Sequence, residues 1–87
     1  MNRTVYRLAR GVRLRRETGG EAMLLVPEGI VALNDTAAAA LELADGSRDL
    51  AAIVAELAER FEAPQTELAQ DVNDLFDSLA SSGFVTR

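Results

Sequence analysis

The sequence predicts a single α+β domain over residues 1–87, in which a three-stranded antiparallel sheet is followed by three helices. Two observations predict it. Up to residue 33, short apolar runs are separated by glycine and proline, which is typical of strands and tight turns. Beyond residue 34, apolar residues recur at helical spacing. Because three strands need one face covered, we expect the helices to pack on the sheet, the last two resembling a winged helix-turn-helix.

The strands are predicted from alternation and turn signals. Residues 1–10 show no clean periodicity and are expected to form an extended arm. Residues 12–15 alternate apolar and charged side chains, and Gly19-Gly20 separates them from the apolar run 22–26, which indicates a β-hairpin. A turn at residues 27–29 leads to a third short strand over residues 30–33.

The helices are predicted from caps and apolar stripes. Asn34 or Asp35 can cap an alanine-rich helix over residues 36–44, and Ser47 or Asp49 can cap a second helix over residues 50–61. Pro64 separates the second helix from a third, which ends before Gly83. The third helix carries an apolar stripe of Leu68, Val72, Leu75, Phe76 and Leu79. Phe84 and Val85 are expected to fold back onto the core.

Composition excludes most kinds of catalysis. The chain has no histidine, cysteine or lysine, so imidazole bases, thiolate nucleophiles, Schiff bases and the common zinc ligands are all missing. We therefore expect no enzymatic activity, no metal and no organic cofactor. No apolar run is long enough to cross a bilayer and no secretory signal is recognisable, which favours a cytoplasmic protein without membrane contact.

Charge is distributed unevenly along the chain. Residues 1–16 hold six arginines and no acid, whereas residues 34–86 hold eleven acids and two arginines. Arginines at 13, 15 and 16 guard the first strand against edge pairing, although such a cluster could also bind nucleic acid or an acidic partner. The third strand, over residues 30–33, has no such guard. An unguarded apolar edge is either covered by the protein itself, here by the third helix, or available to a strand from a partner.

The segment from Leu24 to Asn34, LLVPEGIVALN, and the later Leu43-Ala44-Asp45-Gly46 resemble pyrroloquinoline quinone (PQQ) biosynthesis protein D. Residues 50–54, Asp71-Val72 and Gly83-Phe84 continue the likeness, which spans roughly residues 7–85. This family consists of peptide chaperones and is the founding example of the recognition elements that bind leader regions of ribosomally made, post-translationally modified peptides (RiPPs).

The resemblance implies a function and a site. A family member binds the ribosomal precursor peptide and delivers it to a radical S-adenosylmethionine (radical SAM) enzyme, which joins a glutamate to a tyrosine. The peptide adds as a strand beside the third strand, in a groove closed by the third helix. In this sequence the two sides of the groove would be formed by Ile30, Val31, Ala32 and Leu33 and by Leu68, Asp71, Val72 and Leu75.

Several alternatives remain open. The stripe containing Leu68, Val72 and Leu75 can be plain core, and Asp71 can be a solvated acid instead of a partner for a basic peptide side chain. The modified peptide can be a different one, and the free edge can pair with its twin, so we expect a monomer or a weak homodimer.

Two further function classes are less favoured. A DNA-binding winged helix would need a basic recognition helix, but the third helix carries four acids and no basic residue, so we expect no nucleic-acid binding. A carboxylate-based metal enzyme could use Asp71, Asp74 and Asp77, but these three more simply form a solvated face.

Overall fold

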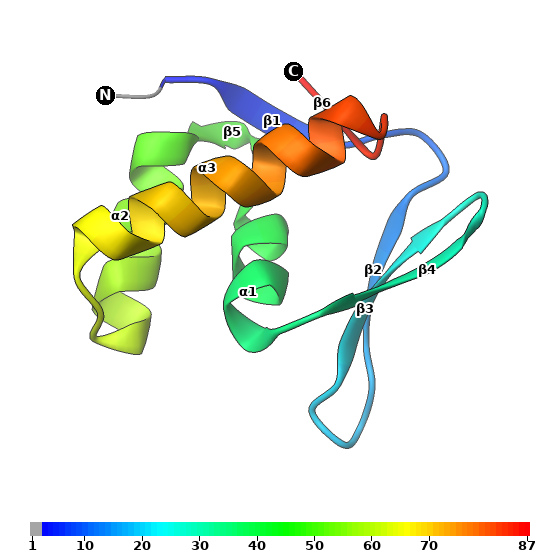
Figure 1. The fold of residues 1–87 in the computed structure, drawn as a ribbon, viewed down its shortest axis with the longest axis horizontal. Helices are drawn as coiled ribbons and strands as arrows, with labels where there is room; N and C mark the ends of the chain where they lie inside the picture. Colours follow the sequence, from blue (N-terminus) through cyan, green and yellow to red (C-terminus); the bar gives the residue numbers. More distant parts are fainter. Residues whose placement is uncertain (1–2) are drawn as a thin grey trace.

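Two small antiparallel sheets and three α helices make up the structure, a computed structural model that describes residues 3–87 (Figure 1). The first sheet has the order β2-β3-β4 and consists of β2 (Arg13–Arg16), β3 (Ala22–Val26) and β4 (Gly29–Leu33). The second has the order β5-β1-β6 and consists of β5 (Asp45–Asp49), β1 (Val5–Leu8) and β6 (Val85–Thr86). The helices are α1 (Asp35–Leu43), α2 (Leu50–Phe61) and α3 (Gln65–Ser81).

The β2-β3-β4 sheet, called the meander below, follows the predicted strands to within one residue at each end. Its register pairs Leu14 with Leu24 and Leu24 with Val31, so these side chains share one face. Leu24 is fully buried, whereas Met23 and Leu25 on the opposite face are only partly covered. The meander therefore has an inner apolar face and an outer face toward solvent.

The helices begin at the capping residues that the sequence offers. The side chain of Asn34 accepts a hydrogen bond from the backbone N–H of Ala37 at 2.8 Å, and that of Asp49 accepts one from Ala52 at 2.8 Å. Helix α2 ends at Glu62, which adopts a left-handed conformation with φ 51°, and α3 begins directly after Pro64. The predicted boundaries of α1 and α2 are confirmed to within one residue.

The core lies between the helices and the β5-β1-β6 sheet. Phe76 of α3 is fully buried and stacks on Tyr6 of β1, with 5.0 Å between the ring centroids. Leu50, Ile53 and Leu57 of α2 pack into the same cluster. Val85 of β6 is 2% exposed, which confirms that the C-terminal segment folds back onto the core.

The prediction of a single sheet covered by helices is wrong. Residues 5–8, expected within an N-terminal arm over residues 1–10, form the central strand β1 of the second sheet; residues 1 and 2 lie outside the described part. Residues 45–49, predicted to lie between the first two helices with Ser47 or Asp49 as a helix cap, form β5, which pairs with β1 through a bulge between the pairs Val5–Asp49 and Arg7–Asp45. This second sheet lies against the helices, while the meander extends to one side with α1 at its base (Figure 1).

In the part of the chain that the structure describes, no helix combines the length and apolar character that a membrane span requires.

Candidate functional site

Strand β4 has one free edge. It pairs with β3 on one side, and no other strand among residues 3–87 pairs with its second side. The strand reads Gly-Ile-Val-Ala-Leu and so lacks the charges or prolines that usually protect an edge. Ile30 is 66% exposed, which makes it the most exposed large apolar side chain of the described residues. The edge therefore presents both apolar side chains and unpaired backbone groups to solvent.

The register fixes which backbone groups face outward. Val26 and Gly29 close the β3–β4 hairpin around a two-residue turn, so they form a hydrogen-bonded pair. Because such pairs alternate along an antiparallel ladder, the pairs Leu25–Ile30 and Met23–Ala32 are of the non-hydrogen-bonded kind. The N–H and C=O groups of Ile30 and Ala32 consequently point away from β3, whereas those of Val31 point toward it.

A cavity of about 370 Å³ lies beside the point where β4 passes into α1. Asn34, Thr36 and Ala37 line one wall, and four residues of α3 line the other: Leu68, Asp71, Val72 and Leu75. These four are the α3 residues of the predicted site, and the structure brings all of them together at one opening. Residues 30–33 do not line this cavity, since it begins one residue beyond the end of β4.

The four α3 residues differ in burial. Leu68 and Val72 are 6% and 2% exposed, so they serve the core and also form the floor of the cavity. Leu75 is half-buried, and Asp71 is exposed with no ion pair to any residue within 3–87. The cavity thus offers an apolar floor with one carboxylate at its margin.

Three lining residues are missing from the sequence prediction, namely Asn34, Thr36 and Ala37. Asn34 is recognisable in the sequence as a helix cap. Its second role, as part of the cavity wall, depends on the direction that the chain takes after β4, which the sequence does not reveal. Helix α1 follows β4 directly and packs against it more extensively than α3 does, so α3 does not cover the length of the strand. The carboxylates of α3 lie on its exposed side, as Glu67, Asp71, Asp74 and Asp77 are all exposed.

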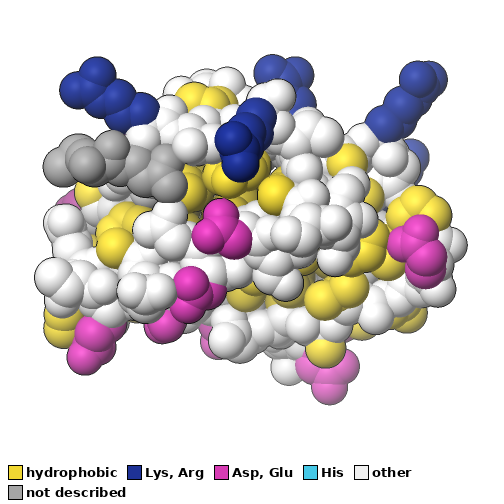
Figure 2. All heavy atoms as spheres, turned by 45° about the horizontal axis from the view of Figure 1, so that its top comes forward, with side chains coloured by type: hydrophobic (Ala, Val, Ile, Leu, Met, Phe, Trp, Pro, Cys, Tyr) yellow, Lys and Arg dark blue, Asp and Glu magenta, His cyan; other side chains and the backbone are white. Residues whose placement is uncertain are grey.

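The β4 edge and the adjoining cavity present groups that can bind a peptide. No group of three or more acidic side chains within residues 3–87 is placed to hold a metal ion. Figure 2 shows a face on which arginine side chains stand along the upper margin while acidic side chains lie below them. The chemistry that the β4 edge and the adjoining cavity can supply is backbone hydrogen bonding, apolar contact and one negative charge.

Comparisons with known proteins point to one family. The profile of the coenzyme PQQ synthesis protein D (PqqD) family matches residues 21–85. The PqqA binding protein of Rhizobium meliloti is 42% identical over 78 residues, covering 88% of this chain and 80% of the relative. That of Klebsiella pneumoniae is 52% identical over 59 residues, covering 67% of this chain and 64% of the relative.

Two solved structures share the fold. The solution structure of the PqqD part of Methylobacterium extorquens PqqCD, a stand-alone RiPP recognition element, superposes with a TM-score of 0.83 at 33% identity, covering 95% of this chain and 89% of that one. Lasso peptide synthetase B1 complexed with the leader peptide has a TM-score of 0.79 at 24% identity, covering 97% of this chain and 100% of that one, which is a likeness of fold alone. The matched residues and these relatives together show that the chain belongs to the PqqD family.

Proposed function

We propose that the chain is a peptide-binding adaptor of PQQ biosynthesis. It binds the ribosomal precursor peptide PqqA as an added strand along β4 and presents it to a radical SAM enzyme in the cytoplasm, where ribosomal peptides are made. The peptide-binding residues are Ile30, Val31, Ala32 and Leu33 of β4 with Leu68, Asp71, Val72 and Leu75 of α3. The names of the relatives, PqqA binding proteins, support this assignment.

The free edge of β4 is the observation that carries the proposal. Strand addition needs outward N–H and C=O groups, and the register gives Ile30 and Ala32 that role. It also needs an edge without protecting charge, and β4 has none. The exposed side chain of Ile30 adds apolar surface that a bound strand would cover.

The cavity supplies selectivity beside the strand. Its volume of about 370 Å³ suits a single large side chain of the peptide. Leu68, Val72 and Leu75 would contact the apolar part of that side chain, and Asp71 would face its polar end or a neighbouring residue. Backbone bonds at β4 then set the direction of the peptide, while the cavity sets its register.

No catalytic role is included in the proposal. Without histidine, cysteine or lysine, the chain lacks the side chains that commonly act as nucleophile or base near neutral pH. The peptide chemistry is therefore assigned to the partner enzyme, and the adaptor needs neither a metal nor an organic cofactor of its own.

The winged helix-turn-helix character is proposed as an architectural likeness only. Helices α2 and α3 follow one another across a short turn, and the β3–β4 hairpin, which precedes them in the chain, would correspond to the wing. The exposed acids of α3 would be repelled by phosphates, so DNA binding is not part of the function. An anisotropy titration with duplex DNA is expected to show no sequence-specific binding at physiological salt.

The experiment that tests the proposal is amide chemical-shift mapping of the full chain with the PqqA peptide. We expect the largest shifts at residues 30–33 and along the side of α3 that contains Leu68 and Leu75. A scrambled peptide of the same composition is the control and should leave these amides unchanged. Shifts that avoid both β4 and α3 would disprove the site, and absence of any PqqA binding would disprove the function.

A further inference from the structure

A second hollow, with a volume of about 600 Å³, lies between β1, the start of β2 and the end of α1. Its floor is apolar and consists of Leu8, Val12, Leu14, Leu41 and Ala44. It is separate from the peptide site, because β2 and β4 are the two opposite edges of the meander. Four charged residues stand around this floor, two acids and two arginines.

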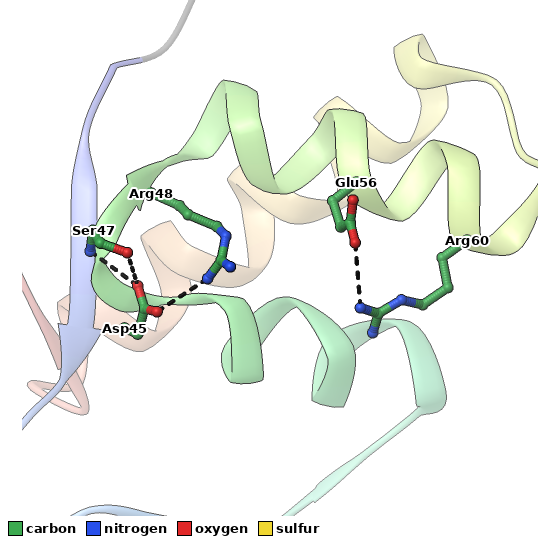
Figure 3. A network of polar contacts seen from close by, with 5 residues as sticks. All are labelled: Asp45, Ser47, Arg48, Glu56 and Arg60. Carbon is green, nitrogen blue, oxygen red and sulfur yellow. Dashed lines mark hydrogen bonds and ion pairs between the residues drawn. The ribbon is translucent and has the colours of Figure 1, made fainter.

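Both acids of the hollow already have partners. Glu42 is paired with Arg16 of β2. One carboxylate oxygen of Asp45 accepts hydrogen bonds from the backbone N and the Oγ of Ser47, at 2.9 and 2.6 Å, and the other pairs with Arg48 at 3.0 Å (Figure 3). Their negative charge is therefore largely compensated within the protein.

Neither arginine of the hollow is held in an ion pair with a described residue. Arg7 and Arg13 form no ion pair with any residue between 3 and 87, and both are exposed. The guanidinium of Arg7 lies over Gly46, with Nη2 3.3 Å from the position that a Cβ of residue 46 would take. Glycine at 46 thus leaves room for the guanidinium beside the hollow.

We propose that this hollow is a second docking site, which takes an acidic segment of a partner protein in which a carboxylate stands beside an apolar side chain. The apolar side chain would cover the floor, and Arg7 and Arg13 would each donate hydrogen bonds to the carboxylate. Guanidinium groups suit this role because their planar donors match both oxygens of a carboxylate. A partner held here leaves β4 free, so the domain can hold its peptide and a second protein at the same time.

An acidic protein segment fits better than nucleic acid. The arginines flank an apolar floor, which has no side-chain groups that could form hydrogen bonds or ion pairs with a phosphate backbone. Among the described residues, no aromatic side chain that could stack on a base lines the hollow. Two neighbouring arginines are already paired, Arg15 with Glu17 and Arg16 with Glu42, which reduces the positive charge that a long polyanion could neutralise there.

The test uses the full ¹⁵N-labelled chain and two capped pentapeptides, one of alternating leucine and glutamate and the other of alternating leucine and glutamine. We expect the glutamate peptide, at millimolar concentration, to shift the amides of Leu8, Val12 and Leu14, and the glutamine peptide to leave them unchanged. The variant Arg7→Gln/Arg13→Gln should bind the glutamate peptide about tenfold more weakly or worse. Arg60→Gln is the matched control, because it removes an arginine whose partner, Glu56, lies far from the hollow on α2 (Figure 3).

The possible outcomes are distinct. Equal shifts from both pentapeptides, shifts only at β4 and α3, or no shifts would overturn the proposal. Preferential binding of a short DNA duplex at the same amides, lost in the double variant, would overturn it in favour of nucleic acid. Unchanged PqqA binding in the double variant shows that the fold and the peptide site are intact. If the double variant unfolds, the single variant Arg13→Gln replaces it, because Arg13 is exposed at the start of β2. This single variant should bind the glutamate peptide about threefold more weakly.

Discussion

Proline substitutions in β4 test strand addition residue by residue. The N–H of Ala32 faces the free edge, so Ala32→Pro removes a bond to the bound peptide and none within the meander. The N–H of Val31 faces Leu24, so Val31→Pro removes a bond of the meander itself. The two variants are matched neighbours that separate binding from folding.

The magnitudes follow from the value of one backbone hydrogen bond. A net loss of about 0.5–1.5 kcal/mol for Ala32→Pro raises the dissociation constant of the peptide by about twofold to tenfold, with unchanged unfolding by urea. Val31→Pro leaves the Leu24 carbonyl unpaired on the buried side and should lower the free energy of unfolding by about 1–3 kcal/mol. Anisotropy of labelled PqqA peptide measures the binding, and circular dichroism in urea measures the stability.

Two results would refute the reasoning. Unchanged PqqA affinity in folded Ala32→Pro would mean that the peptide does not pair with the β4 edge. Equal destabilisation by the two prolines would mean that the hydrogen-bonded pairs have been assigned to the wrong residues of the ladder.

Three other substitutions test the groove and the fold. Leu75→Asp places a charge at the half-buried wall of the cavity. We expect circular dichroism to show a folded protein and the affinity for PqqA to fall at least about tenfold. An unfolded variant would contradict the groove assignment. Asp49→Ala removes the cap that accepts from Ala52 and should cost about 1 kcal/mol in urea unfolding, whereas an unchanged midpoint would show that the cap is not needed. Hydrogen bonds from the Ser47 side chain and backbone lower the pKa of Asp45 below its ordinary value of 3.8, so its stabilising effect is complete above that pH and is lost as pH falls through the lowered value. The difference in melting temperature between wild type and Asp45→Asn should therefore be constant near neutral pH and shrink below pH 3.8; a difference independent of pH would contradict this.

The sequence predicts those elements that are determined locally. The hairpin strands carry their own turn signals, and helices α1 and α2 begin after the capping residues Asn34 and Asp49. By contrast, β5 reads Asp-Gly-Ser-Arg-Asp and contains no apolar residue, so nothing in its own composition indicates a strand. It is extended because β1 pairs with it, and that pairing joins segments about forty residues apart, between Val5 and Asp49.

The candidate site also has one part that the sequence predicts and one part that depends on tertiary packing. The α3 wall of the cavity could be predicted, because the resemblance singled out Leu68, Asp71, Val72 and Leu75, and the structure places them at one opening. The α1 wall could not, since Thr36 and Ala37 look like any first turn of an alanine-rich helix. Their position depends on how α1 packs beside α3, which no local pattern encodes.

The pairing of β1 with β5 and β6 has a consequence for the order of folding. Leu8 pairs with Val85, a contact that spans almost the whole chain. During synthesis β1 is made before both of its neighbours in the sheet, and β6 is made after all the other strands and helices of the described residues. The meander, by contrast, joins consecutive strands and can form while the chain is still growing. The free edge of β4 can therefore form early, whereas the second sheet can close only after β6 has been made.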